Sequence, residues 1–315
     1  MPARDPACAV LHRKATNTLT AVELNHGETL CFERRDATRV HLRLVNTGAE
    51  IVSTTLNRPG IEERKARTVY RFWADLEIGG SSHRLVREVG TPASFYEPWE
   101  LAGLRLWLDA VDAVFDFMNQ THGLCRPREN CSGGLPERRA CRLAVQDAAL
   151  RICPETLHPW CPLPPGGLRI EDCYRGEDCW LGAYDGASAH AGLDINHPSG
   201  TPLYAPFDLD RQHLFHRLET GHNNNRWRGF RRWNHGEEWI LESSHMTEVL
   251  VAEDAPLRRG ERYAFGAGVN TWDHEHSHFG FTIYTRGELI PLDPWILFWQ
   301  MYRDQEAGEE PAEPV

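Results

Sequence analysis

Three histidines at alternate positions, His274, His276 and His278, lie near the end of the chain in the stretch WDHEHSHFGF. Residues two apart in a β-strand point to the same face of the sheet, so this spacing predicts three imidazoles side by side. Imidazole nitrogens bind zinc and also act as general bases near neutral pH. The cluster therefore predicts a metal, or a metal with a catalytic base, although an exposed polar strand face stays open as the simpler interpretation.

A second pair of residues with the same chemistry, His190 and Asp194, lies in the stretch AHAGLDINHPSGTPLYAP. A histidine four residues before an aspartate is weak evidence when taken alone. Together with one histidine of the later cluster, however, the pair offers two nitrogens and one carboxylate oxygen. Three protein ligands with a fourth position left for water form the usual catalytic zinc site. The sequence therefore predicts a zinc ion (Zn2+) as cofactor.

The order of these motifs over about residues 181–300 resembles the lysostaphin/LytM-type zinc metallopeptidases, which include the β-lytic endopeptidases. That family carries an H-x-G-x-D motif, then G-T-P-V-x-A-P, then a histidine in the middle of the domain, and finally an H-L-H-F pair. Four separated motifs in the right order make the resemblance specific. The matching residues here are His190, Gly192 and Asp194; Gly200, Thr201, Pro202, Ala205 and Pro206; His245; and His276, His278 and Phe279.

The resemblance implies a small, mainly antiparallel β domain with a narrow groove that is floored by zinc. It also implies hydrolysis of peptide bonds in peptidoglycan, the expected partner, by a water that the metal activates. The implied zinc ligands are His190, Asp194 and His278. His245 and His276 would flank the water and the developing oxyanion, as general base or as stabilising groups.

A basic and aromatic stretch, RWRGFRRW, lies between Pro206 of the second motif and His245, in a chain that is acidic overall. Arginine beside aromatic rings suits carbohydrate stacking and the recognition of anionic groups. The alternative is a loop that tryptophans anchor and whose arginines are solvated. We predict substrate binding by Arg226, Trp227, Arg228, Arg231 and Trp233.

This stretch also favours a second function that uses the same site. A metal-dependent lyase or hydrolase of acidic polysaccharide would use the histidines to abstract a sugar proton. A third possibility is a non-catalytic module that binds the cell wall. The complete set of ligands argues against it, since degenerate members usually lose one.

Composition excludes several other classes of protein. The formal net charge of −11 argues against nucleic-acid binding, and no apolar run is long enough to predict a membrane span. Nine cysteines are present, seven of them between Cys125 and Cys179, in loop-like sequence that we expect disulfides to hold together. Disulfides indicate an oxidising compartment, so we expect a secreted or periplasmic protein whose signal peptide is missing from the chain. The oligomeric state is not indicated.

Strand-like runs separated by turn residues dominate both halves of the 315-residue chain. We therefore predict a mainly β protein with an N-terminal antiparallel β domain at 1–120, followed by a disulfide-stapled Cys-rich segment at 121–180. A C-terminal antiparallel β metallopeptidase-like domain is predicted at 181–303 and a disordered acidic tail at 304–315. Residues 103–118 alternate like a strand in their first half, but apolar residues at helical spacing favour a helix there.

Overall fold

The computed structural model describes residues 9–62, 65–115, 134–136, 139–184, 188–215, 225–266 and 275–308. The protein is mainly β, as predicted, and its described strands pair antiparallel except for β1 (Val10–Lys14) and β3 (Thr29–Glu33), which are parallel. The chain forms two compact units, which consist of Met1–Ile152 with Leu181–His190 and of Cys153–Trp180 with Ala191–Val315. The domain boundaries expected at residues 120, 180 and 303 stay a prediction.

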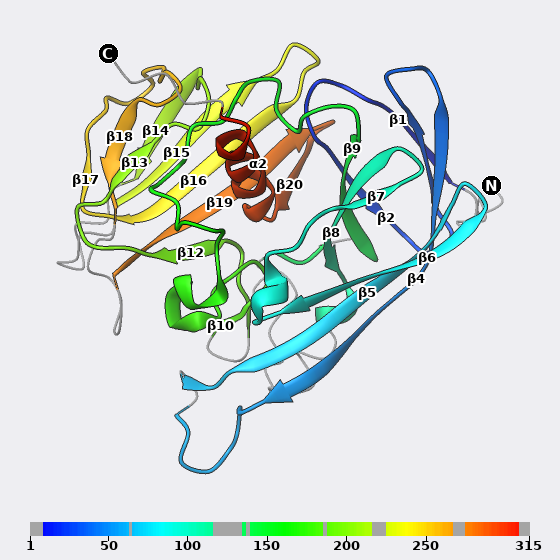
Figure 1. Ribbon diagram of the computed structural model, residues 1–315, viewed down its shortest axis with the longest axis horizontal. Coiled ribbons are helices and arrows are strands. Elements are labelled where there is room, and N and C mark those ends of the chain that lie inside the picture. The colour runs from blue at the N-terminus through cyan, green and yellow to red at the C-terminus, as the bar shows by residue number, and fades with distance from the viewer. Residues whose placement is uncertain are drawn as a thin grey trace, which may run out of the picture. The chain divides into compact units, whose positions relative to one another are not determined.

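The first unit contains two larger sheets (Figure 1). Strand β8 packs against β4, β5 and β6 of the other sheet, so apolar side chains of both sheets share one core. The five-stranded sheet has the order β1-β3-β4-β5-β6, with β4 at Arg39–Thr54, β5 at Thr68–Ile78 and β6 at Ser81–Val89. The four-stranded sheet has the order β2-β9-β8-β7, at Thr20–Leu24, Cys141–Asp147, Leu104–Val111 and Trp99–Leu101. A short hairpin of β10 (Ala183–Tyr184) and β11 (Ser188–Ala189) completes the unit.

The prediction of a helix within residues 103–118 is wrong for most of this stretch. Leu104–Val111 is strand β8, paired with β7 and β9, and only residues 113–115 are helical within the described part of this stretch. Nearly every residue of β8 is buried, so apolar side chains occupy both faces of the strand. A strand that is apolar on both faces loses its simple alternation, and its apolar residues then also fit a helical spacing.

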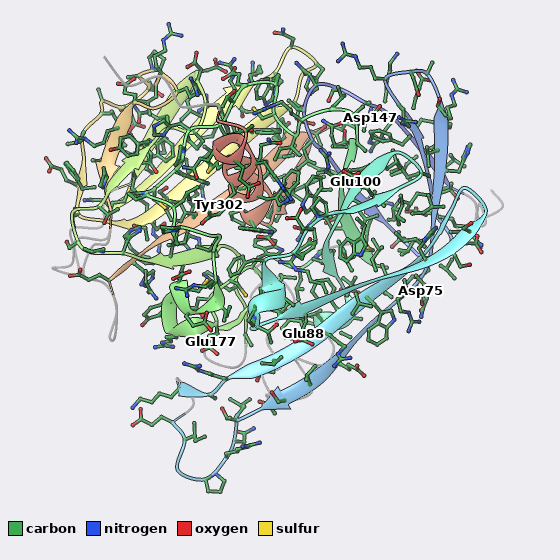
Figure 2. The ribbon with its side chains drawn as sticks, viewed as in Figure 1. Asp75, Glu88, Glu100, Asp147, Glu177 and Tyr302 are labelled. Carbon is green, nitrogen blue, oxygen red and sulfur yellow. The ribbon has the colours of Figure 1, made fainter. Side chains whose placement is uncertain are left out.

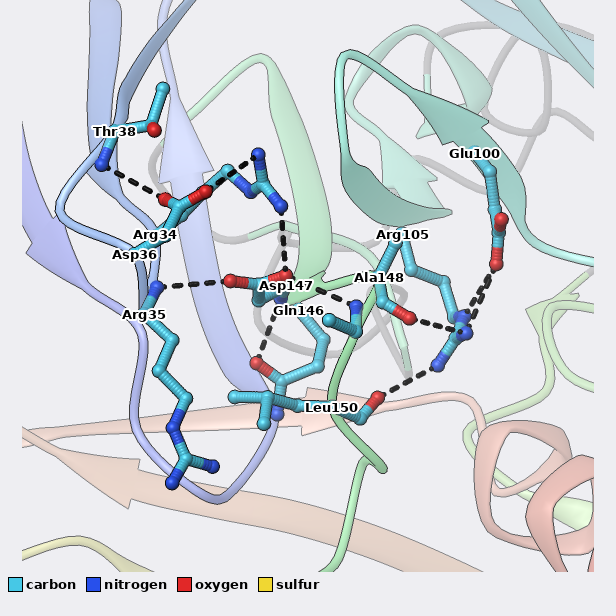
Figure 3. A network of polar contacts seen from close by, with 11 residues as sticks. Arg34, Arg35, Asp36, Thr38, Glu100, Arg105, Gln146, Asp147, Ala148 and Leu150 are labelled. Atoms are coloured by element: carbon cyan, nitrogen blue, oxygen red, sulfur yellow. Dashed lines mark hydrogen bonds and ion pairs between the residues drawn. The ribbon is translucent and has the colours of Figure 1, made fainter.

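Asp147, at the end of β9, ties loops of the first unit together (Figures 2 and 3). Its carboxylate accepts hydrogen bonds from the backbone N–H of Arg35 at 2.9 Å and of Ala149 at 3.1 Å, and it lies 3.5 Å from the Arg34 guanidinium. Nearby, Arg105 pairs with Glu100 and donates to two backbone carbonyls. Backbone groups of these turns are thus satisfied by charged side chains.

The second unit is built on one antiparallel sheet with the order β12-β19-β16-β15-β14, in which β20 also pairs with β19 (Figure 1). Its strands alternate buried and less buried residues, so the sheet has one apolar face and one polar face. A small sheet, β13-β18-β17, lies at Pro202–Tyr204, Arg262–Phe265 and Glu248–Val249. The main strands are β12 (Leu193–Asn196), β14 (Arg211–Phe215), β15 (Asn225–Arg232), β16 (Glu238–Met246), β19 (His276–Thr285) and β20 (Glu288–Leu292).

Helix α2 (Trp295–Glu306) covers the apolar face of this sheet. Phe298 packs its ring against Phe279 of β19 at 5.5 Å between centroids, and Trp160 contacts both rings. The helix includes residues 304–306, which we expected in the disordered tail. Asp304 is buried there, because its carboxylate accepts hydrogen bonds from the Leu157 N–H and the Gln300 side chain at 2.7 Å each.

The expected disulfides are absent from the described part of the chain. Its six cysteines, at positions 31, 141, 153, 161, 173 and 179, are all buried and none is joined to another by a disulfide. The segment from residue 153 to 180 instead contributes large side chains, Trp160, Tyr174 and Trp180, to a core. Burial of these aromatic rings supplies the packing that the sequence seemed to lack. Cys8, Cys125 and Cys131 lie outside the described residues.

Among the described residues, no helix combines the length and the apolar character that a membrane crossing requires.

Candidate metal site

The predicted metal ligands meet where β12 pairs with β19. Asp194 lies directly opposite His278 in the antiparallel register, so their side chains share one face of the sheet. His190 comes from the chain just before β12. One ligand atom each from His190, Asp194 and His278 lies within 4.8 Å of the others. Two imidazole nitrogens and one carboxylate oxygen at this spacing suit a zinc ion and leave a coordination position for water.

The Asp194 carboxylate orients both histidines of the late motif. One oxygen accepts a hydrogen bond from Nδ1 of His278 at 2.8 Å, and the other lies 3.3 Å from Nε2 of His276. Burial lowers the pKa of His278, but the charge of Asp194 and its hydrogen bond outweigh this, so that the pKa is raised. The carboxylate itself is buried. A buried charge of this kind requires partners, which imidazoles or a cation provide.

Gly192 explains why the first motif requires a glycine between its histidine and its aspartate. A Cβ atom at this position would lie 2.5 Å from Nε2 of His278 and 2.7 Å from the carbonyl oxygen of Phe279. Only a residue without a side chain allows the backbone to come this close. The close approach helps to fix the imidazole of His278 beside Asp194.

His245 reaches the site through a β-bulge at the end of β16. Between the pairs Trp227↔Ser243 and Asn225↔Met246, two residues of β16 oppose the single residue Arg226 of β15. His245 has a left-handed backbone with φ of 60°, which breaks the alternation of the strand. Bulges of this type turn a side chain toward a new direction and are frequent beside active sites.

The imidazole of His245 lies beside those of the late motif. Its ring centroid is 4.9 Å from that of His276 and 6.3 Å from that of His278. Burial lowers the pKa of His245 to about 3, with His276, His278 and Arg226 adding to this effect and Asp194 opposing it. The imidazole is therefore neutral near pH 7, with one nitrogen able to donate and the other able to accept a hydrogen bond.

The basic stretch divides between the two faces of the sheet. Arg228 pairs across the strands with Glu242, which is two residues from Ser244, the partner of His278. Arg228 therefore lies on the same face as His278, where its side chain contacts Glu242 at 2.7 Å. Arg226 of β15 lies opposite the bulge that contains His245, and its charge acts on both His245 and His278. Arg226 thus acts on a predicted metal ligand, His278, and Arg228 lies on the same face of the sheet as that ligand.

The other members of the predicted substrate-binding set lie elsewhere. Trp227 is fully buried and stacks on Tyr263 at 4.0 Å, and Trp233 is buried against Trp239. Arg231 shares the apolar side of β15 with Trp227 and pairs with Glu155 at 3.2 Å. The two tryptophans anchor strand β15 to the core, and the substrate-binding role of these three residues stays a prediction.

The remaining predicted residue, His274, lies outside the described residues. The site also includes a residue that the sequence did not indicate, Tyr174, whose ring stacks on that of His276 at 4.2 Å between centroids. Tyr174 lies in the segment expected to be stapled by disulfides, before the predicted catalytic domain. No spacing rule links it to a histidine about a hundred positions later, so only tertiary structure brings it to the site.

No protein-family model matches the chain, and no curated protein does. Solved structures similar to it include the antimicrobial peptidase lysostaphin from Staphylococcus simulans, 16% identical over 38% of this chain and 49% of that chain, with a TM-score of 0.28. LytU is 21% identical over 34% of this chain and 71% of that chain, with a TM-score of 0.28. A zinc containing peptidase from Vibrio cholerae is 13% identical over 88% of this chain and 86% of that chain, also with a TM-score of 0.28. The chain spans half the length of a second lysostaphin structure that it matches.

The chain is similar to these solved peptidases, and its motifs resemble those of the lysostaphin/LytM-type zinc metallopeptidases.

Proposed function

We propose that the protein is a zinc-dependent endopeptidase that hydrolyses peptide bonds of peptidoglycan. The observation that carries the proposal is the convergence of His190, Asp194 and His278 within 4.8 Å, with His245 and His276 beside them. Three ligands and two further imidazoles at one place provide the groups that metal-assisted hydrolysis of an amide requires. Peptidoglycan lies outside the cytoplasmic membrane, so the proposal includes a secreted or periplasmic protein.

The protein's own residues have distinct roles in this proposal. A bound zinc ion would act as a Lewis acid and make a water molecule nucleophilic near neutral pH. His190, Asp194 and His278 would hold the ion. His245, neutral because its burial disfavours the imidazolium, accepts a proton from the attacking water or donates to the developing oxyanion. His276, which Asp194 orients at 3.3 Å, provides the second imidazole on that side.

The arginines of the polar sheet face set the kind of substrate that this site favours. Arg226 places positive charge beside the imidazoles, and Arg228 lies on the same face of the sheet, while the protein as a whole has a net charge of −11. A guanidinium binds a carboxylate through paired hydrogen bonds. We therefore propose that a carboxylate of the substrate's peptide binds at these arginines. The same two cations also favour the alternative, an enzyme that acts on acidic polysaccharide.

The test is an assay of zinc-loaded protein on purified peptidoglycan, in parallel with a panel of acidic polysaccharides. New amine ends released from peptidoglycan, and absent with the variant Asp194→Ala or after chelation of the metal, support the endopeptidase. An absorbance from unsaturated sugar would instead establish a lyase. Binding of either polymer without any product would establish a non-catalytic module.

A further inference from the structure

A short turn outside the four sequence motifs contacts the proposed catalytic histidine. This turn, residues 173–179 with the sequence CYRGEDC, includes the 3-10 helix Tyr174–Gly176 and lies in the second unit. Figure 2 labels its residue Glu177. The ring of Tyr174 stacks on the ring of His276 with 4.2 Å between centroids and 25° between planes. Both side chains are buried, so this contact is sealed from solvent.

Backbone contacts tie this turn to β12, the strand that carries Asp194. Cys173 forms a β-bridge with Ile195, and the side-chain amide of Asn196 donates to the Cys173 carbonyl at 2.8 Å. The backbone N–H of Asp194 donates to the carbonyl of Asp178 at 2.9 Å. The turn is therefore held on both sides of Tyr174 by the predicted metal ligand Asp194 and the two residues that follow it.

The turn that holds Tyr174 contains one residue in an unfavourable backbone conformation. Arg175 adopts a left-handed conformation with φ of 56°, which is energetically unfavourable for most residues other than glycine and asparagine. This conformation places the Arg175 guanidinium 5.0 Å from the centre of the Tyr174 ring, a cation–π distance. The ring of Tyr174 is thus held by contacts with both Arg175 and His276.

We infer that Tyr174 is a positioning residue for His276. Its ring is buried between the imidazole of His276 and the guanidinium of Arg175. It packs against the imidazole plane and keeps Nε2 of His276 directed toward Asp194, at 3.3 Å. A displacement of a catalytic group by about 1 Å can cost roughly 10²-fold in rate. This inference rests on the proposed function, since it assigns His276 a place in the reaction.

The first measurement compares two variants of Tyr174 in zinc-loaded protein. Tyr174→Phe keeps the stacked ring and is expected to keep the wild-type kcat. Tyr174→Leu removes the ring and is expected to lower kcat by roughly 10- to 100-fold, with KM and zinc content unchanged. Tyr263→Phe and Tyr263→Leu are the matched controls. Tyr263 is equally buried and stacks on Trp227 at 4.0 Å, so its leucine variant reports the loss of a stacked ring elsewhere in the same unit.

The second measurement needs no turnover. In protein with isotope-labelled histidine, the imidazole protons of His276 are identified by their loss in His276→Ala. A stacked aromatic ring shifts these protons upfield. The shift is expected in the wild type and in Tyr174→Phe, and it is expected to disappear in Tyr174→Leu.

The outcomes separate this inference from the proposed function. The positioning role would be overturned if Tyr174→Leu kept the wild-type kcat, or if its His276 protons kept the same upfield shift as in the wild type. Either result would leave the endopeptidase intact. An equal loss of kcat in Tyr263→Leu would also overturn it, because the loss would then be a general effect of a missing ring. A wild type with no hydrolytic product contradicts the proposed function, and the spectra alone then decide whether Tyr174 holds His276.

Discussion

The backbone of Gly192 lies against the imidazole of His278, so closely that a Cβ at Gly192 would fall 2.5 Å from Nε2 of that ring. The two residues are far apart in the sequence, and the pairing of β12 with β19 brings them together. Two of the motifs that predicted the site are thus in direct contact. The glycine of the first motif leaves the space in which the histidine of the last motif stands.

Substitution of Gly192 by alanine tests this contact. The added methyl group must displace the His278 ring or the backbone of β19, so Gly192→Ala is expected to weaken zinc binding by roughly 10- to 100-fold, the usual effect of disturbing the groups that orient a metal ligand. Competition with a chromophoric chelator measures the affinity. Gly280→Ala is the control, since its Cβ would meet only Cβ of Glu242 at 3.3 Å. Equal zinc affinities in the two variants would show that the contact with Gly192 is unimportant.

The separation of metal ligands from catalytic groups gives a second prediction. His278→Ala is expected to lose zinc and activity together, because one of three protein ligands is removed. His245→Ala and His276→Ala are expected to keep nearly stoichiometric zinc and to lose about 10²- to 10⁴-fold in activity. Metal analysis beside a turnover assay checks both outcomes. A metal-free His276→Ala with zinc retained in His278→Ala would reverse the assignment.

A third prediction concerns the arginines on the polar face of the sheet. Arg226→Gln and Arg228→Gln are each expected to raise KM by about 10-fold, as loss of a charged hydrogen bond to a substrate carboxylate would. Zinc content should not change. Because salt screens such contacts, added salt should weaken the wild type more than the variants. Arg231→Gln is the control, since this arginine faces the apolar side and pairs with Glu155. An unchanged KM in both test variants would exclude the arginines from substrate binding.

A fourth prediction follows from His197, whose Nε2 lies 2.9 Å from the hydroxyl oxygen of Ser277. Burial, with a smaller contribution from His276, lowers the pKa of His197 to about 4. Between about pH 6.5 and pH 4 the unfolded chain therefore binds a proton that the folded protein does not. The free energy of unfolding that neutral His197 contributes is fully present above about pH 6.5. It falls by up to about 3 kcal/mol as the pH falls through this window.

Chemical denaturation of the wild type and of His197→Gln across this pH range measures the effect. Other groups titrate in the same range, so the difference in slope between the two proteins is the quantity to compare. The variant is expected to lose less stability than the wild type on acidification. Parallel curves would show that His197 does not contribute.

A fifth prediction concerns the first unit, where Arg142 and Asp109 form a buried ion pair at 2.6 Å. Both side chains are almost completely buried, at 1% and 0% exposure. Asp109→Ala leaves the arginine charge without its closest carboxylate and is expected to cost about 3–5 kcal/mol in the free energy of unfolding. Asp75→Ala, which breaks the more exposed pair with Arg84, is expected to cost much less. If urea denaturation gave similar losses in the free energy of unfolding for Asp109→Ala and Asp75→Ala, burial would not determine the cost of breaking these ion pairs.

The sequence by itself determined which residues are candidate metal ligands and much of the β character. A strand alternates its faces, so His276 and His278 had to share a side, and the pairing of Asp194 with His278 agrees with the four ordered motifs. The alternation of a strand and the spacing within each motif are local, so a sequence displays them directly, whereas the pairing of Asp194 with His278 joins distant parts of the chain.

Tertiary structure alone decided the rest. The bulge that turns His245 toward the site depends on how β15 and β16 pair, and the stack of Tyr174 on His276 depends on a turn that docks on β12. Trp227 was predicted to lie in a loop, yet it is a residue of strand β15 with a fully buried side chain. Burial and long-range pairing are properties of the whole packed core, whose free energy depends on which distant surfaces exclude water together, and no short stretch of residues records that choice.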